Sequence, residues 1–299
     1  MRAITYSSYG PPEVLRLSEV PKPVPRDDEV LIRVRAVEAT KADCEMRSFN
    51  YAVKWFWLPL RIAMGIGKPR RPILGFYFAG EVAAVGEAVS GFAVGDEVFG
   101  SSNFRLGAYA EFLKVPASYA IIEKPGNMSF TEAAAVPLGG WNALHFMNLA
   151  RLEAGDEVLI NGAGGSIGCH AIQIARARGA RVTAVDGAHK EAAVKALGAA
   201  EFIDYRIEDF SARSQQWDVI FDMVPGSPSG RYIRRLKPGG CYLSGNPTLA
   251  TMLRCAITNR FTNKRDSFAF AEESRGALRE LKEMIEAGQI GGIVDTVLP

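Results

Sequence analysis

The sequence predicts a two-domain α/β protein, with a mostly β domain followed by a doubly wound parallel sheet. Three observations support this fold class. Short β-type runs separated by glycine and proline fill the first third, strand-like and helix-like segments alternate from about residue 157, and a glycine-rich turn joins the first strand and helix of that alternation. The 299 residues also suffice for two hydrophobic cores.

The first third is expected to form the mostly β domain. Its strand-like runs cover residues 29–37, 80–85, 96–99 and 108–115. The most apolar stretch, residues 55–66, is interrupted by Pro59 and Arg61 and is shorter than the roughly 20 apolar residues that a spanning helix needs. We therefore expect no membrane span, and we expect this stretch to be buried or to face a substrate.

The second half alternates between the two kinds of element. Strands are expected at 158–160, 181–185, 202–203, 218–224, 241–243 and 264–270, and helices at 167–178, 191–197 and 231–236. A last, amphipathic helix is expected at 272–287, because Leu278, Leu281 and Ile285 recur at helical spacing. This order is typical of a parallel sheet with helices on both faces.

Composition excludes several classes of function. The 35 Lys and Arg residues nearly balance the 33 Asp and Glu residues, so the net charge of +2 indicates neither nucleic acid nor an anionic membrane as a partner. The cysteines form no C-x-x-C pair, which disfavours a disulfide framework and a zinc knuckle. The N-terminus has no secretion-signal pattern. We expect a cytoplasmic protein in a reducing compartment.

The clearest functional motif is the turn Asn-Gly-Ala-Gly-Gly-Ser-Ile-Gly at residues 161–168, between a strand and a helix. Free amide groups at a helix N-terminus bind a pyrophosphate, and glycine lets the backbone approach it. The first glycine suits the tight turn, the middle residues suit the phosphates, and the last glycine suits close helix packing. The candidate cofactor residues of this turn are Gly162, Gly165, Ser166, Ile167 and Gly168.

Residues after the second strand carry a divided signal about the dinucleotide. Asp186 stands about where an acid accepts hydrogen bonds from the adenosine ribose, which favours NAD. Lys190 and the Tyr205-Arg206 pair are suited to a 2′-phosphate, which a neighbouring carboxylate would repel. The residues by themselves leave NAD and NADP open.

Several short motifs, in this order, resemble the medium-chain dehydrogenase/reductases, and among them the zinc-independent, zeta-crystallin-like quinone oxidoreductases. They are YGPPEVL at 9–15, AGEV at 79–82, VGDEVFG at 94–100, GAYAEF at 107–112, the glycine turn, LGA at 197–199 and LKPGG at 236–240. The resemblance implies a GroES-like catalytic domain of residues 1–123 and 272–299, a Rossmann domain of residues 124–271, and an active site between them.

The resemblance also implies a reaction without zinc. Zinc-dependent relatives hold the catalytic metal with a Cys and a His-Glu pair, and the matching positions here are Thr40 and Phe76-Tyr77. The four-cysteine lobe for structural zinc is missing as well. Without a Lewis acid, hydride transfer suits a conjugated acceptor such as a quinone or an enone.

Single site residues follow from the same resemblance. Thr40, near the nicotinamide, and Tyr51, in an aromatic segment with Trp55 and Trp57, are the candidate catalytic residues. Asp43 and Arg47 match a D-x-x-x-R pattern that we interpret as an ion pair. Residues implied to bind the cofactor are Asn142, Leu243, Ser244 and Asn246 near the nicotinamide, and Lys190 and Tyr205 at the 2′-phosphate, which favours NADPH over NADH despite Asp186.

We therefore predict an NAD(P)H-dependent, zinc-independent oxidoreductase that transfers hydride to quinones or other α,β-unsaturated carbonyls. An NAD-linked, alcohol dehydrogenase-like enzyme and a noncatalytic nucleotide-binding protein are the alternatives. The chain ends at Pro299, where the family usually continues with a helix and a strand, and this favours the noncatalytic alternative. The family pairs through an edge strand, so residues 264–270 are the expected interface of a homodimer.

Overall fold

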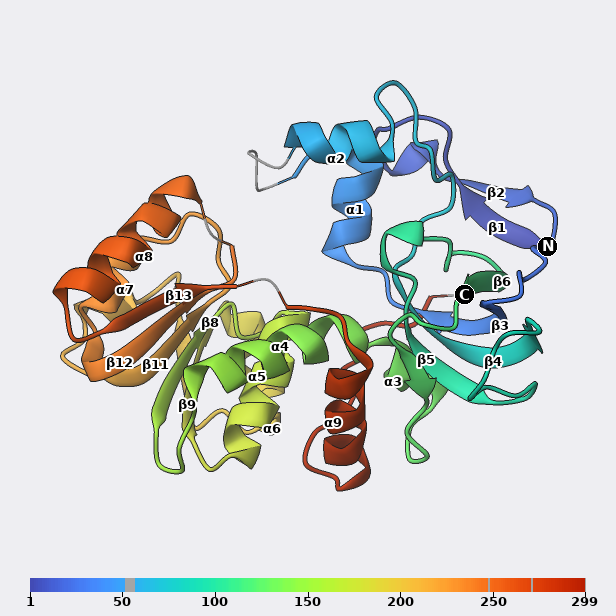
Figure 1. The fold of residues 1–299 in the computed structure, drawn as a ribbon. Helices are drawn as coiled ribbons and strands as arrows, with labels where there is room; N and C mark the ends of the chain where they lie inside the picture. Colours follow the sequence, from blue (N-terminus) through green and yellow to red (C-terminus); the bar gives the residue numbers. More distant parts are fainter. Residues whose placement is uncertain (52–56, 247, 270, 299) are drawn as a thin grey trace. The chain divides into compact units, whose positions relative to one another are not determined.

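The computed structural model describes residues 1–51, 57–246, 248–269 and 271–298, and the chain divides into two compact units (Figure 1). The first unit comprises Met1–Pro137, Glu273–Glu286 and Val294–Pro299, and the second comprises Leu138–Glu272 and Ala287–Ile293. The sequence-based limits differ from this division, since they assign residues 124–137 to the second domain and 287–293 to the first. The limits of a compact unit depend on contacts between residues that are distant in sequence. A change in the sequence pattern locates these limits only approximately.

A five-stranded antiparallel sheet forms the centre of the first unit, in the order β6-β3-β4-β5-β7. Its strands are β3 (Glu29–Val37), β4 (Tyr77–Val85), β5 (Glu97–Ser101), β6 (Phe112–Pro116) and β7 (Ile121–Glu123); β1 (Arg2–Thr5) and β2 (Arg16–Glu19) form a separate pair. Side chains alternate along a strand, so Val30, Ile32 and Phe78 share one core. The mostly β domain predicted from the sequence is confirmed.

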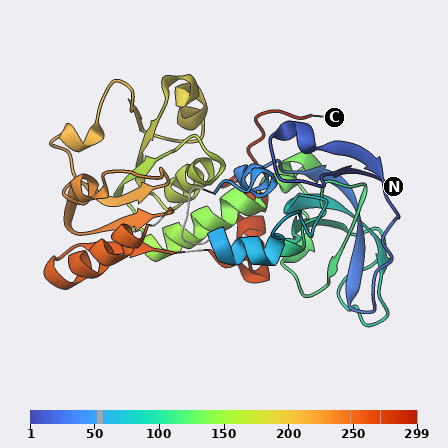
Figure 2. The same cartoon turned by 90° about the horizontal axis from the view of Figure 1, so that it is seen from above.

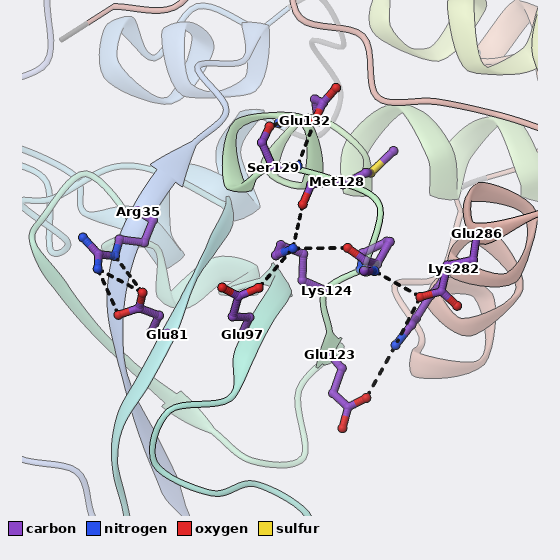
Figure 3. Close-up of polar contacts among 12 residues, drawn as sticks. Arg35, Glu81, Glu97, Glu123, Lys124, Met128, Ser129, Glu132, Lys282 and Glu286 are labelled. Carbon is purple, nitrogen blue, oxygen red and sulfur yellow. Dashed lines mark hydrogen bonds and ion pairs between the residues drawn. The ribbon is translucent and has the colours of Figure 1, made fainter. Parts of the chain in front are cut away.

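Short helices complete the first unit. They are α1 (Lys41–Ser48), α2 (Trp57–Met64), α3 (Phe130–Ala134) and α9 (Arg275–Glu286), with the 3-10 helices η1 (Pro12–Val14) and η3 (Asn103–Arg105). Figure 3 shows how α9 is attached to the end of β7: the Lys282 ammonium lies 3.5 Å from the Glu123 carboxylate, and the Gly126 amide donates to Glu286 at 3.2 Å. These contacts explain why α9 belongs to the first unit although it follows the second in sequence.

Among the described residues of the apolar stretch 55–66, helix α2 is buried on one side only, so the expected burial holds in part; that the stretch faces a substrate stays a prediction. Leu60 is buried, but Trp57, Leu58 and Ile62 are 39%, 59% and 51% exposed. Burial is incomplete because an apolar residue is buried only where another element covers it. Trp55 lies outside the described residues. Among the helices that the structure describes, none is long and apolar enough to cross a membrane.

A buried carboxylate on β3 links this strand to the edge strand β6 and to the 3-10 helix η3. The Glu29 side chain is only 1% exposed and forms ion pairs with Arg105 at 2.6 Å and Lys114 at 3.2 Å. Burial by itself would raise the pKa of Glu29, but the Arg26 amide and these two cations lower it to about 2. A carboxylate with a depressed pKa stabilises the fold fully above its unfolded pKa near 4.5, and that stability is lost as the pH falls toward 2.

Replacing Glu29 by glutamine is therefore expected to lower the free energy of unfolding at pH 7 by about 2–3 kcal/mol. Urea denaturation followed by circular dichroism measures this loss. The difference between wild type and variant should shrink as the pH falls through the window between 4.5 and about 2. The exposed ion pair of Arg2 and Glu111 provides the control, because Glu111→Gln should change stability far less. Equal losses in both variants would contradict the assignment.

A six-stranded parallel sheet forms the second unit, in the order β10-β9-β8-β11-β12-β13. Its strands are β8 (Glu157–Asn161), β9 (Arg181–Asp186), β10 (Glu201–Asp204), β11 (Trp217–Asp222), β12 (Leu236–Ser244) and β13 (Arg265–Phe268). The chain starts at β8, runs outward to β10, and then returns to the other side of β8. The carboxyl ends of β8 and β11 thus form a topological switch point, where open α/β sheets bind ligands. The predicted doubly wound sheet is confirmed.

Helices cover this sheet on both faces (Figure 1). They are α4 (Pro137–Ala150), α5 (Ser166–Ala177), α6 (Glu191–Ala196), α7 (Ser229–Ile233) and α8 (Leu249–Phe261), with the 3-10 helices η4 (Ala188–Lys190) and η5 (Phe210–Ala212). Right-handed crossovers place α5 and α6 on one face and α7 and α8 on the other, because the two halves of the sheet grow in opposite directions. Leu159, Ile220 and Tyr242 are buried in one core.

Candidate functional site

The glycine turn lies between β8 and α5, at the switch point. Gly162 has a φ of +84°, a conformation that favours glycine, and the amides of Gly162 and Ala163 donate to the Val185 carbonyl. A Cβ atom on Gly168 would lie 2.4 Å from the Gly162 carbonyl oxygen, whereas a Cβ atom on Gly165 would have no neighbour nearer than 3.6 Å. Gly168 therefore serves packing, and Gly165 leaves open space at the start of α5.

Asp186, at the end of β9, fastens this turn to the neighbouring strand. One carboxylate oxygen accepts the Gly164 amide at 2.8 Å, and the other accepts the Gly187 amide at 2.8 Å. The Lys190 ammonium lies 3.5 Å from the same carboxylate. A Cβ atom on Gly164 would lie 2.3 Å from Cδ of Lys190, so the aliphatic part of Lys190 crosses the turn directly over this glycine. Sequence reasoning missed Gly164, although it stands in the same glycine run.

The other residues expected at the 2′-phosphate lie just after strand β10, which pairs with β9. The Tyr205 amide donates to the Asp186 carbonyl at 3.3 Å, and the Tyr205 side chain is 57% exposed. The Arg206 guanidinium lies 5.7 Å from the centre of the Tyr205 ring. Lys190, Tyr205 and Arg206 thus lie around the carboxyl ends of β9 and β10, beside the glycine turn. All three residues lie near the end of β9 that Asp186 occupies.

A buried carboxylate that sequence reasoning missed joins the ends of the three central strands. Asp222 accepts hydrogen bonds from the Asn161 amide group at 2.9 Å and from the Tyr242 hydroxyl at 2.6 Å. Burial raises the pKa of Asp222. A cavity of about 370 Å³ lies beside it, and its lining includes Ser244 and Asn246. The only signal in the sequence was the acidic end of an otherwise apolar strand.

The residues expected near the nicotinamide have different surroundings. Leu243 is fully buried in β12, so only its backbone is available to a ligand. Asn246 donates its side-chain amide to the Met223 carbonyl at 2.8 Å. Asn142, on α4, donates to the Leu138 carbonyl of the preceding turn at 2.9 Å. One turn earlier, a Cβ atom on Gly139 would lie 2.6 Å from the Ser166 hydroxyl, so α4 packs closely against the start of α5.

In the first unit, Thr40 begins helix α1 with a capping box. Its hydroxyl donates to Asp43 at 2.6 Å, and the Asp43 amide donates back to this hydroxyl at 3.1 Å. Asp43 also accepts the Gly75 amide at 3.0 Å, and burial raises its pKa. The expected Asp43–Arg47 ion pair is wrong: Arg47 donates instead to the Gly10 carbonyl at 3.2 Å. Four-residue spacing permits such a pair, but the buried Asp43 is turned toward backbone donors.

Tyr51 belongs to an aromatic cluster in the first unit. Its hydroxyl lies 3.1 Å from the sulfur of Met46, and its ring packs edge-on against Phe49 at 5.1 Å. Burial raises the pKa of Tyr51. The Tyr77 hydroxyl donates to Glu273 at 3.1 Å. Within the described residues, no group of three or more His, Cys, Asp or Glu side chains is arranged to hold a metal ion.

The fold and the glycine turn define a class of protein, the oxidoreductases that join a Rossmann domain to a mostly β domain. Comparisons with known proteins agree. Residues 26–126 match the alcohol dehydrogenase GroES-like domain family, and residues 166–286 match the zinc-binding dehydrogenase family. A quinone oxidoreductase of Lama guanicoe is 34% identical over 251 residues, which cover 80% of this chain and 71% of that protein.

Two further relatives cover nearly the whole chain. An NADPH-dependent alkenal/one oxidoreductase of Arabidopsis thaliana is 30% identical over 99% of this chain and 72% of its own length. The solved quinone oxidoreductase of Coxiella burnetii is 30% identical, with a TM-score of 0.83 over 97% of this chain and 88% of that one. The chain belongs to the quinone oxidoreductase branch of the medium-chain dehydrogenase/reductase superfamily, and it is an oxidoreductase.

Proposed function

We propose that the protein is an NADPH-dependent, zinc-independent reductase that transfers hydride to quinones or other α,β-unsaturated carbonyls. The observation that carries this proposal is the residue set at the zinc positions. Thr40, Phe76 and Tyr77 offer no thiolate, imidazole or carboxylate to a metal. The acceptor must then be activated by its own conjugation. The names of the relatives from Lama guanicoe and Arabidopsis thaliana support the same substrates.

The second unit has features that fit a dinucleotide. The open space at Gly165 and the N-terminus of α5 suit a pyrophosphate, and Gly162, Ser166, Ile167 and Gly168 complete that turn. Asn142 and the strand end formed by Leu243, Ser244 and Asn246 would hold the nicotinamide. When bound, the reduced nicotinamide supplies the hydride.

NADPH is preferred over NADH because of how Asp186 is bonded. An acid that selects NADH accepts hydrogen bonds from the ribose hydroxyls and repels a 2′-phosphate by its charge. Both oxygens of Asp186 already accept backbone amides, and Lys190 partly neutralises their charge. Lys190 and Tyr205 are then the residues that would hold the 2′-phosphate. NADH remains usable, since the pyrophosphate site is common to both.

Thr40 and Tyr51 are proposed to contact the acceptor, in different ways. The Thr40 hydroxyl has given its hydrogen to Asp43, so it can only accept a further hydrogen bond. The Tyr51 hydroxyl lies against the sulfur of Met46, a weak acceptor, and its raised pKa keeps it protonated at neutral pH. Of the two, Tyr51 is the better donor to a carbonyl oxygen.

The test combines cofactor binding with turnover. NADPH and NADH fluorescence is titrated with the purified chain, and absorbance at the nicotinamide band is then followed after addition of 9,10-phenanthrenequinone or 1,4-benzoquinone. We expect tighter binding of NADPH and quinone-dependent oxidation that a zinc chelator does not change. Binding without turnover over quinones and enones would identify a noncatalytic nucleotide-binding protein. Preference for NADH with oxidation of alcohols would favour the dehydrogenase alternative.

We further propose that two chains of this cytoplasmic protein form a homodimer through β13 and α8. Among the strands that the structure describes, β13 pairs only with β12, which leaves its other edge open. Next to it, α8 exposes Leu253, Ile257 and Phe261, four residues apart on one face, at 66%, 51% and 77%. A second copy would cover both features.

Replacing Leu253 and Ile257 by glutamate is expected to convert this dimer to a monomer, because charges on both faces of an apolar contact oppose its burial. Sedimentation velocity at micromolar concentration measures the change. Glutamate at Val94, which is 67% exposed in the first unit, is the control and should leave the dimer intact. A wild-type monomer would contradict the proposal.

A further inference from the structure

Helix α2 and the loop after it carry an exposed apolar stripe beside exposed cations. We define this α2 surface as Leu58, Ile62 and Ile66 together with Lys68, Arg70 and Arg71. Leu58 and Ile62 lie four residues apart on α2, Ile66 follows in the loop after Gly65, and the three are 59%, 51% and 68% exposed. Figures 1 and 2 show α2 next to α1 in the first unit.

The helix is held from its opposite side. The Arg61 guanidinium lies 4.0 Å from the centre of the Tyr9 ring and 4.4 Å from that of Phe49. Leu60 is buried on the same side. This side of α2 thus packs against the first unit, whereas Leu58 and Ile62 stay exposed.

Charge is strongly segregated around this stripe. The sequence has no Asp or Glu between Glu45 and Glu81, whereas the same stretch contains six Lys and Arg residues. Lys68, Arg70 and Arg71 are exposed, and none of the three forms an ion pair with a described residue. Glu45, on α1, lies 3.8 Å from Lys41 and is thus already paired. The net charge of +2 for the whole chain conceals this local positive field.

We propose that the α2 surface binds the headgroup region of a membrane that contains anionic phospholipid. A short apolar stripe flanked by cations enters the boundary between headgroups and acyl chains, while the cations remain at the phosphate level. Near an anionic bilayer, each basic residue contributes a binding free energy similar to that of one buried apolar group. For so small a patch, neither the cations alone nor the apolar residues alone would give firm binding. The proposal is independent of the proposed reaction.

The experiment measures binding of the full chain to vesicles by co-sedimentation. One preparation of vesicles contains phosphatidylcholine alone. In the other, about 30% of the lipid is phosphatidylglycerol, whose negative charge attracts basic residues to the vesicle surface. We expect the wild type to bind the anionic vesicles at least tenfold better. Raising the salt from about 0.1 M to about 0.5 M should release most of it, because the Debye length shortens.

Two variants separate the contributions of charge and apolar area. Lys68→Glu with Arg70→Glu should lower binding to anionic vesicles at least tenfold, and Leu58→Ser with Ile62→Ser should lower it severalfold. Arg234→Glu with Arg279→Glu is the matched control, because it makes the same change in net charge at exposed positions elsewhere and should retain binding within about twofold. If the charge-reversed loop lowers stability, Lys68→Gln with Arg70→Gln replaces it.

Several outcomes would overturn the proposal. They are equal binding to both kinds of vesicle, an equal loss in the control variant, and unchanged binding after Leu58→Ser with Ile62→Ser. A fourth is a change in oligomeric state of the Leu58→Ser and Ile62→Ser variant without vesicle binding by the wild type, which would show that the stripe joins two copies. A fifth is a wild type that binds no vesicles together with loss of turnover of a water-soluble quinone in the Leu58→Ser and Ile62→Ser variant, which would assign the stripe to substrate binding.

Discussion

Alanine in place of Gly165 is expected to lower the affinity for NADPH and NADH alike by at least tenfold, with no change in melting temperature. A Cβ atom at this position has no neighbour nearer than 3.6 Å in the folded chain, so the fold tolerates it. The same methyl group would occupy the open space before α5, where backbone must approach the pyrophosphate. Fluorescence titration of both cofactors measures the effect, and a tenfold loss corresponds to about 1.4 kcal/mol.

Gly168→Ala is also expected to lose cofactor binding, but because the substitution disturbs the fold. Its Cβ atom would lie 2.4 Å from the Gly162 carbonyl oxygen and 2.6 Å from that of Ala163. Backbone cannot yield as a flexible side chain can, so we expect a lower melting temperature together with lost binding. Normal cofactor affinity in the Gly165→Ala variant would show that the dinucleotide does not use this turn.

Lys190→Ala is expected to weaken NADPH binding by about 10–100-fold and NADH binding by less than about threefold, as for a lost charge-assisted contact to one phosphate. In the structure the Lys190 ammonium lies 3.5 Å from Asp186, beside Tyr205 and Arg206. Only the 2′-phosphate distinguishes the two cofactors, so the ratio of their dissociation constants isolates this contact. A melting curve checks that the turn remains folded.

Two controls sharpen this result. Lys195 is an exposed lysine of the adjoining helix α6 and pairs with Glu191, so Lys195→Ala should leave the ratio unchanged. Asp186→Asn keeps one side-chain oxygen for an amide of the glycine turn but removes the charge, and it should raise the preference for NADPH. An equal loss of NADPH and NADH affinity in Lys190→Ala would mean that Lys190 only supports the turn against which it packs.

Much of the fold was predictable from the sequence because its signals are local. Short β-type runs separated by glycine and proline predicted the mostly β domain of the first unit, and the alternation of strand and helix predicted the parallel sheet. The glycine turn at residues 161–168 predicted the cofactor site because its function depends on backbone conformation within eight consecutive residues. The role of each side chain around that turn was not predictable in the same way.

The sequence by itself thus determined the two fold types, the family and the position of the nucleotide turn. Only the tertiary structure decided that Asp186 bonds to the Gly164 amide, that Asp43 turns to Thr40 and Gly75 instead of Arg47, and that the outer face of α2 is uncovered. The physical reason is the same in each case. A charged or apolar side chain takes whichever partner the packing of distant segments brings near it, and residue spacing along the chain records only the partners on its own element.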